Sequence, residues 1–99
     1  MEIKKTQSGD ICVLTLIGRV DTVTSPKLQE SLLETVSSCE CVELDFADVD
    51  YVSSAGLRVL LMGEKNSKAA GKTMTLKNVS VEVMEVFEVT GFTGVLTIM

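Results

Sequence analysis

The sequence predicts a single α/β domain with the element order β-β-α-β-α-β-α-β and a mixed, mainly parallel sheet flanked by helices. Short runs rich in β-branched and aliphatic residues alternate along the chain with longer runs whose apolar residues recur at helical spacing. The chain has 99 residues, 45% of them hydrophobic, which suffices for one core and one domain spanning residues 1–99. Helical connections between successive strands favour parallel pairing.

The first third of the chain predicts a hairpin followed by a helix. Residues 3–7 and 11–17 are strand candidates, and the Ser-Gly-Asp sequence between them is typical of a turn. Ser25 before Pro26 indicates a helix start, because a serine side chain caps a helix and proline suits its first turn. This helix is expected to end at residues 37–38. Its apolar stripe comprises Leu28, Leu32, Leu33 and Val36.

Strands and helices continue to alternate in the rest of the chain. A helix is predicted over about residues 55–70, with Gly71 suited to the left-handed position at its C-terminus. Another helix is predicted from Ser80, as its N-cap, to Gly91 as its terminator. The remaining predicted strands are residues 41–46, 73–76 and 95–99.

The composition excludes several classes of protein. Nine basic residues oppose fourteen acidic ones, with a net charge of -5 and one Tyr, so nucleic acid is a poor partner. No apolar run approaches 18 residues without a charge, and direct membrane insertion is not expected. Residues 1–5 do not lead into an apolar stretch of signal-peptide length, so we expect a cytoplasmic protein.

The sequence lacks the usual machinery of an enzyme. The absence of His excludes Ser-His and Cys-His couples and imidazole metal sites. The acidic residues Asp45, Asp48 and Asp50 predict a solvated loop, with a weak magnesium contact as the alternative. A calcium loop begun at Asp48 would need glycine and glutamate where Ser53 and Val59 stand. Since no glycine-rich phosphate loop follows a strand, we expect no catalytic activity, no cofactor and no bound metal.

The three cysteines, Cys12, Cys39 and Cys41, are expected to be reduced thiols. An odd number of cysteines without a secretory signal is typical of cytoplasmic proteins. Cys39 and Cys41 lack metal-ligand spacing, and two positions apart on a strand they would share a face, too crowded for easy bridging. Packing in or near the core is the main interpretation for all three, and redox sensing is the alternative.

Two serines stand where the helix at about residues 55–70 is expected to begin. The simpler interpretation is that Ser53 or Ser54 is the N-cap of this helix, as serine often is. The alternative is a phosphorylation site, because free N–H groups and the positive end of the helix dipole favour a phosphate there. Spacing alone leaves both interpretations open.

Three motifs resemble the STAS-domain family, and most closely its bacterial anti-sigma-factor antagonists. Residues 48–61, DVDYVSSAGLRVLL, resemble the signature of the family. Residues 18–21, Gly-Arg-Val-Asp, before Pro26 and Leu28, resemble its motif between the second strand and the first helix. Residues 80–92 resemble its third helix and the following turn. The three motifs occur in the order of the family and span almost the whole chain.

The resemblance implies a fold with a mixed sheet flanked by helices and a phosphorylated serine. In the family, a partner kinase phosphorylates the serine two places before the glycine of the S-[SA]-G-L element, and that position is Ser54 here. Ser53 stands where many members carry Asp, so it is the competing hydroxyl and belongs to the expected partner-binding surface.

Four further residues complete this expected surface. If the two strands are parallel neighbours, Asp21 and Thr22 lie on the same rim as Ser54. The resemblance makes Asp21 a kinase-contacting residue, while the alternative is that its carboxylate caps its own turn. Gly56 either lets a partner approach the helix start closely or relieves crowding inside the helix. Arg58 either contacts a carboxylate or phosphate or is an ordinary solvated residue.

The function implied by the resemblance is that of an anti-sigma-factor antagonist switched by phosphorylation. The unmodified form would sequester an anti-sigma factor that is a serine kinase of the GHKL type, so that sigma factor is released. Phosphate on Ser54 would weaken this binding, and a metal-dependent serine phosphatase would restore it. The alternative is a regulatory STAS subunit of a membrane transporter or lipid-transport assembly, without a phosphoswitch.

Overall fold

The element order follows the sequence prediction through the third helix. The computed structural model describes residues 1–99. Its strands are β1 (Glu2–Ser8), β2 (Ile11–Val20), β3 (Cys41–Val52) and β4 (Thr73–Lys77). Its helices are α1 (Ser25–Ser38), α2 (Ser54–Ala69), α3 (Val81–Thr90) and the short 3-10 helix η1 (Phe92–Gly94).

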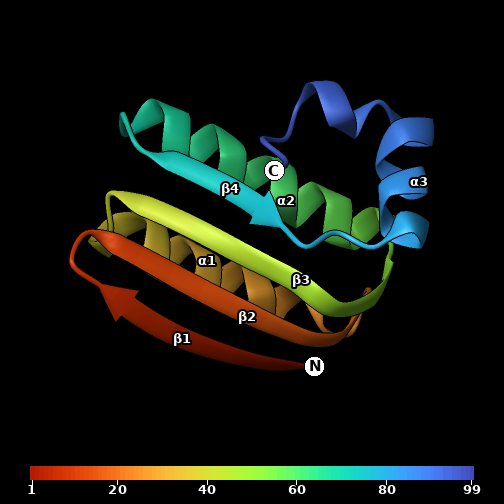
Figure 1. The fold of residues 1–99 in the computed structure, drawn as a ribbon, viewed down its shortest axis with the longest axis horizontal. Helices are drawn as coiled ribbons and strands as arrows, with labels where there is room; N and C mark the ends of the chain where they lie inside the picture. The colour runs from red at the N-terminus through yellow and green to blue at the C-terminus, as the bar shows by residue number, and fades with distance from the viewer.

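The four strands form one mixed sheet in the order β1-β2-β3-β4 (Figure 1). β1 and β2 pair antiparallel as a hairpin, whereas β2, β3 and β4 run parallel. As a consequence, the carboxyl ends of β2, β3 and β4 lie at one edge of the sheet. The segments that follow these ends, including the starts of α1 and α2, are therefore gathered on that side of the molecule.

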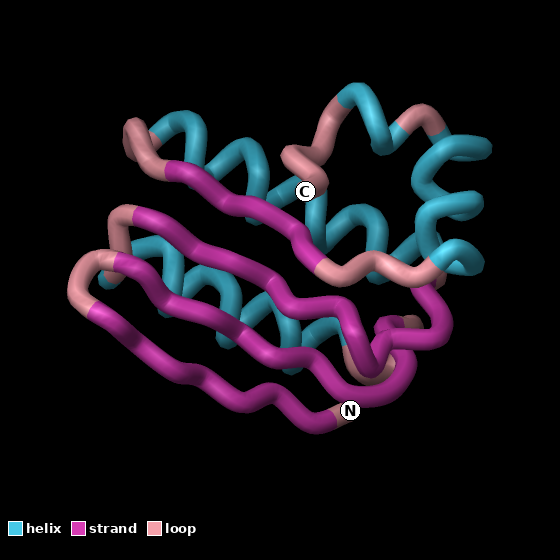
Figure 2. The backbone as a smooth tube through the Cα atoms, viewed as in Figure 1, coloured by secondary structure: helices cyan, strands magenta, loops and turns pink.

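Helices α1 and α2 cover the same face of the sheet (Figure 2). Strand residues alternate between this face and the opposite one, so every second side chain is buried from Cys12 to Leu16 in β2 and from Val42 to Phe46 in β3. Fully buried side chains from both layers meet in the core: Leu14, Leu16, Leu44 and Phe46 from the sheet, with Leu28, Leu32 and Leu60 from the helices. Burial of these apolar surfaces is the main force that holds the helices on the sheet.

The last predicted strand is reduced to one bridge. Leu76 pairs in parallel with Ile98, donating its N–H to Thr97 and accepting the N–H of Met99, both at 2.9 Å. Residues 92–94, just before the expected strand at residues 95–99, form η1. The buried carboxylate of Glu64 on α2 accepts the N–H of Thr97 at 3.2 Å and so holds this segment against the domain.

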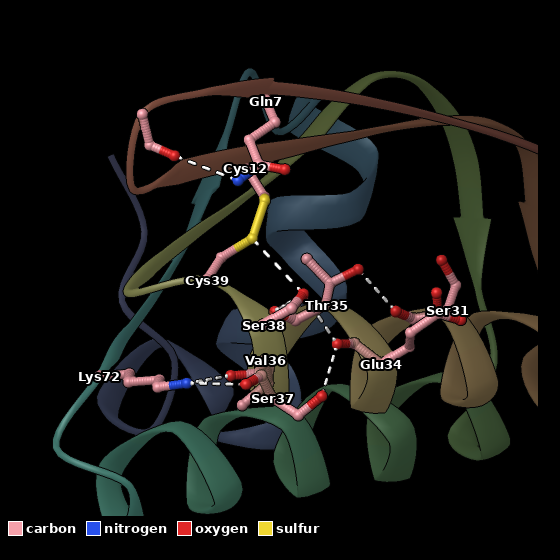
Figure 3. The surroundings of a disulfide bond; sticks show 11 residues. Gln7, Cys12, Ser31, Glu34, Thr35, Val36, Ser37, Ser38, Cys39 and Lys72 are labelled. Carbon is pink, nitrogen blue, oxygen red and sulfur yellow. Dashed lines mark hydrogen bonds between the residues drawn. A yellow bond between two sulfur atoms is a disulfide. The ribbon is translucent and has the colours of Figure 1, made fainter.

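The prediction that all three cysteines are reduced is wrong for Cys12 and Cys39, which form a disulfide (Figure 3). Cys39 is the C-cap of α1 rather than a strand residue, and it lies beside the start of β2 with a Cα–Cα distance of 6.1 Å. Both side chains are almost completely buried. Cys41, the first residue of β3, is a free and partly exposed thiol. The pairing joins residues that only the fold brings together.

The C-terminal end of α1 lies near this disulfide and is completed by a distant lysine. Lys72 precedes β4, and its Nζ donates to the carbonyl oxygens of Val36 at 2.8 Å and Ser37 at 3.3 Å (Figure 3). These carbonyls belong to the last turn of α1, which contains no basic residue of its own. The positive charge therefore meets the negative end of the helix dipole.

Candidate functional site

Ser53 is the N-cap residue of α2. Its backbone is extended, and its Oγ accepts the N–H of Gly56 at 3.2 Å, the hydrogen bond of an N-cap. Its own N–H donates to the carbonyl of Val20 at the end of β2, at 2.8 Å. The side chain is only partly exposed. The predicted capping interpretation is therefore confirmed for Ser53, and this hydroxyl has a structural task.

Ser54 differs from its neighbour in each of these respects. It is the first residue of α2, its side chain is exposed, and its hydroxyl makes no hydrogen bond within the chain. It stands where the first N–H groups of a helix point outward without intrahelical partners. The Ser54 hydroxyl is thus accessible, and its modification would break no hydrogen bond that stabilises the fold.

Gly56 is packed against the sheet. The residue is buried, and a Cβ built on it would lie 2.9 Å from the backbone oxygen of Val20 and 2.7 Å from the Val20 Cγ1. It would also lie 3.1 Å from the Val52 Cγ1. This geometry supports relief of crowding, but the crowding is between the start of α2 and the ends of β2 and β3 rather than inside the helix. Glycine lets the start of α2 approach the ends of β2 and β3.

Asp21 organises the loop between β2 and α1. Its Oδ1 accepts the N–H groups of Val23 and Thr24, each at 3.0 Å, so the carboxylate caps its own turn. The pKa of Asp21 lies below its ordinary range, chiefly because the Thr24 N–H donates to the charged form. The Thr24 hydroxyl, the Val23 N–H and the charge of Arg19 act in the same direction, while desolvation opposes them.

The start of α1 departs from the sequence prediction in its details. Thr24, not Ser25, is the N-cap residue, and it makes no side-chain capping bond. The Ser25 hydroxyl instead donates back to the carbonyl of Asp21. α1 therefore begins without the side-chain cap that the sequence assigned to Ser25, while the Asp21 carboxylate satisfies N–H groups of the loop before the helix.

Thr22 and Arg58 come together in a shallow cavity of about 270 Å³ between the starts of α1 and α2. Both side chains are exposed. The cavity is lined by Thr22, Ser25, Pro26, Gln29, Ala55, Arg58, Val59 and Met62. The five residues expected around Ser54 therefore occupy one rim, because β2 and β3 are parallel neighbours and both end there.

Sequence analysis missed one part of this rim. Arg19 stands opposite Tyr51 in the β2–β3 register, and its guanidinium lies over the Tyr51 ring, 4.3 Å from the centroid. The same guanidinium is 3.6 Å from the Asp21 carboxylate. Only the strand register brings the three side chains together, although Arg19 and Asp21 share one motif and Tyr51 precedes the serines.

No three residues of the usual metal-binding types come together. Asp45 is engaged locally, since it accepts the Ala47 N–H at 3.0 Å and the Asn78 amide at 3.1 Å. The pKa of Asp45 is lowered, because desolvation, which raises it, is outweighed by these hydrogen bonds and by Lys77. No helix combines the length and hydropathy needed to span a bilayer.

Comparison with known families decides what kind of domain carries this rim. A family model described as "Mlab, STAS domain" matches residues 3–98, almost the entire chain. The chain belongs to the STAS-domain family. The resemblance inferred from the three motifs is thereby confirmed.

Within that family, this STAS domain is related to bacterial anti-sigma factor antagonists. BtrV of Bordetella bronchiseptica, described as an anti-sigma factor antagonist, is 30% identical over 99 residues, covering 99% of this chain and 85% of that protein. The anti-sigma-B factor antagonist of Bacillus subtilis is 29% identical over 94 residues, covering 95% of this chain and 85% of that protein.

Solved structures confirm the STAS fold. The anti-sigma factor antagonist SpoIIAA in its unphosphorylated form superposes with a TM-score of 0.83 at 16% identity, covering 99% of this chain and 88% of that one. SpoIIAA from Bacillus in its phosphorylated form gives a TM-score of 0.76 at 15% identity, covering 99% of this chain and 91% of that one. The same fold thus accommodates a phosphorylated and an unphosphorylated state in that protein.

Proposed function

We propose that this STAS domain, residues 1–99, is a cytoplasmic anti-sigma-factor antagonist whose binding is switched by phosphorylation of Ser54. The observation that carries the proposal is the contrast between the two serines at the start of α2. Ser53 caps the helix and is partly buried, whereas Ser54 is exposed and free of hydrogen bonds. A kinase can therefore reach and modify Ser54 without dismantling the start of α2.

The partner in this proposal is an anti-sigma factor that is also a serine kinase of the GHKL type. Binding of the unmodified domain sequesters that protein, and sigma factor is released. The relationship to BtrV and to the Bacillus subtilis antagonist supports this class of partner. ATP belongs to the kinase, and a metal-dependent serine phosphatase returns the domain to its unmodified form. The domain itself acts by binding and performs no catalysis.

The rim supplies the contact surface for that partner in this proposal. Asp21 offers a carboxylate that is held in position and stays ionised, because hydrogen bonds from its own turn lower its pKa. Thr22 and Arg58 are exposed on either side of the cavity between the helix starts. Ser53 and Gly56 contribute by fixing where α2 begins rather than by offering free polar groups.

Phosphorylation would change this surface mainly through charge. A phosphate adds about -1.5 to -2 charges at neutral pH. The first turn of α2 contains no acidic residue, and its free N–H groups tolerate an anion, so the fold survives the modification. A partner that fits the unmodified rim would instead have to desolvate a dianion in the interface, which weakens binding.

The test combines phosphorylation with binding. The purified domain is incubated with the serine kinase anti-sigma factor of its own genome and ATP, and phosphopeptides are identified by mass spectrometry. We expect one phosphate at Ser54, none in Ser54→Ala, and an unchanged site in Ser53→Ala. Calorimetry should show that Ser54→Ala binds like the wild type and that Ser54→Asp binds more weakly.

Two results would contradict the proposal in different ways. Phosphate on Ser53 alone would move the switch by one residue. No phosphate on either serine, together with no binding, would refute the phosphoswitch and favour the transport-subunit alternative. Asp21→Ala should bind the kinase more weakly, and its far-ultraviolet circular dichroism should match the wild type, which separates loss of a contact from unfolding.

A further inference from the structure

Helix α3 carries a groove that the proposed function does not use. α3 packs through Val83 and Phe87, whose ring meets Phe46 edge to face with a centroid distance of 6.3 Å. On a different face lies a cavity of about 470 Å³, which we call the α3 groove. It is lined by Val79, Val81, Met84, Glu85 and Glu88. The last four follow the i, i+3, i+4, i+7 spacing of one helix stripe.

The groove is apolar at one end and acidic at the other. Val79, Val81 and Met84 come first along the chain; Val79 and Met84 are half-buried against the core, while the Val81 side chain is 73% exposed. Such exposure on a helix leaves apolar surface that nothing in the chain covers. Methionine adapts its shape to different partners, and Met84 borders this surface. An apolar anchor of a partner would fit this end.

The carboxylates at the other end are not neutralised within the chain. No Lys or Arg follows Lys77 in the sequence, and the three ion pairs of the protein do not involve α3. The last turn of α3, which contains Glu88, has no basic residue. The negative end of the helix dipole therefore adds to the potential of Glu85 and Glu88 instead of opposing it. Cations would be attracted here.

We propose that the α3 groove docks a basic amphipathic helix of a second protein. The partner's apolar side chains would cover Val79, Val81 and Met84, and its Lys or Arg residues would meet Glu85 and Glu88. Anionic lipid is disfavoured as the occupant because α3 is acidic. A second copy of this chain is disfavoured for the same reason, since it also carries a net charge of -5. This inference does not depend on phosphorylation of Ser54.

A synthetic peptide provides the probe. A helical peptide with leucines at i, i+3, i+4 and i+7 and lysines elsewhere is titrated into the ¹⁵N-labelled domain. We expect amide shifts concentrated at residues 79–89, and weaker binding as salt rises from about 50 to 300 mM, because ions screen exposed charges. A leucine-glutamate peptide of the same pattern should not bind.

Matched variants locate the interaction. Val81→Ser and Glu85→Gln should each weaken peptide binding, and together at least about tenfold. Val23→Ser and Glu30→Gln, which change a valine that is 86% exposed and an exposed glutamate elsewhere, should leave peptide binding unchanged. Glu85→Lys should reduce the preference for the leucine-lysine peptide, because the new ammonium group offsets the charge of Glu88. The four changed side chains are all exposed, so the substitutions should not disturb the core. A thermal melt of each variant checks that it folds.

Three outcomes would overturn the inference. Equal affinity of the leucine-lysine peptide for the wild type and for the Val81→Ser, Glu85→Gln double variant would show that the groove is not the docking site. Amide shifts confined to the rim around Ser54 would have the same meaning. Self-association of the domain without peptide, abolished by Val81→Ser, would make a second copy the occupant.

Discussion

Replacement of Gly56 by alanine tests how closely α2 approaches the sheet. The added Cβ would lie 2.9 Å from the Val20 backbone oxygen and within 3.1 Å of the Val20 and Val52 methyl carbons. The oxygen is fixed, because it also accepts the Ser53 N–H. The β-branched valines have few alternative rotamers in the core. The start of α2 must therefore move away from β2 and β3.

The expected cost follows from two opposing contributions. Overpacking of a core contact typically destabilises by about 1–3 kcal/mol. Alanine returns up to about 1 kcal/mol relative to glycine inside a helix. We expect Gly56→Ala to lower the free energy of unfolding by about 1–2 kcal/mol, which in a domain of this size lowers the melting temperature by about 4–16 °C.

Gly63→Ala, in the same helix, is the matched control. Its Cβ would lie 2.5 Å from the Leu32 Cδ2 and 2.8 Å from the Met74 Sδ, which are the far ends of flexible side chains. These atoms can shift, so the gain in helix propensity offsets more of the strain, and we expect a change within about 1 kcal/mol. Urea unfolding followed by circular dichroism measures both variants. A Gly56→Ala domain as stable as the wild type, or more stable than Gly63→Ala, would refute this reasoning.

Three further predictions concern the disulfide, the N-cap of α2 and the Asp21 carboxylate. The disulfide between Cys12 and Cys39 closes a loop with a sequence separation of 27, which corresponds to about 3.5 kcal/mol at 25 °C by loop-closure entropy. Cys12→Ala should lower the free energy of unfolding by that amount relative to the oxidised wild type. A thiol reductant should lower the urea midpoint of the wild type but not that of the variant. Identical wild-type midpoints with and without reductant would disprove the bond. Ser53→Ala should lower the free energy of unfolding by about 0.5–2 kcal/mol because the N-cap is lost, whereas Ser54→Ala should change it by no more than about 0.5 kcal/mol. Equal losses for the two variants in urea unfolding would contradict the assignment of the cap to Ser53. Asp21 has a lowered pKa, so its charged form stabilises the fold above the ordinary Asp range, and that contribution is lost as pH falls through the lowered value. Asp21→Asn should therefore be less stable than the wild type at pH 7, with a difference that narrows below about pH 4, and a difference in unfolding free energy that does not change between pH 7 and pH 3 would contradict it.

Local signals in the sequence account for the elements that were predicted well. The helix from Ser80 to Gly91 is an example. The Ser80 hydroxyl accepts the Val83 N–H at 3.2 Å, and Gly91 takes the left-handed conformation with φ of 79°. Both features depend on residues within one turn of the helix end, and residue chemistry alone indicates them.

The sequence failed where the outcome depends on distant parts of the chain. Cys12 and Cys39 meet because β2 begins beside the end of α1, which spacing along the chain does not encode. β3 runs on to Val52, well beyond the predicted residue 46, through register shifts against β2. Strand pairing supports that irregular extension, whereas the acidic residues within it suggested a loop.

In the candidate site, too, some features could be predicted from the sequence and others depend on the folded backbone. The order of the motifs placed Asp21 and Ser54 on one rim, and the parallel pairing of β2 and β3 produces that arrangement. Sequence could not separate the roles of Ser53 and Ser54, because both fit the start of a helix. The extended backbone of Ser53 and its bond to Gly56 make the distinction.

The bond between Lys72 and the end of α1 has a consequence for the cooperativity of unfolding. The Val36 carbonyl accepts from a residue 36 positions later, and α2 lies between the two in the chain. The last turn of α1 is therefore fully satisfied only when α2 and the turn before β4 are in place. Opening of that turn would expose the α1 carbonyls to water at the same time. Amide protons at the end of α1 and around Lys72 should consequently exchange in one opening event, which joins the two halves of the chain into a single folding unit.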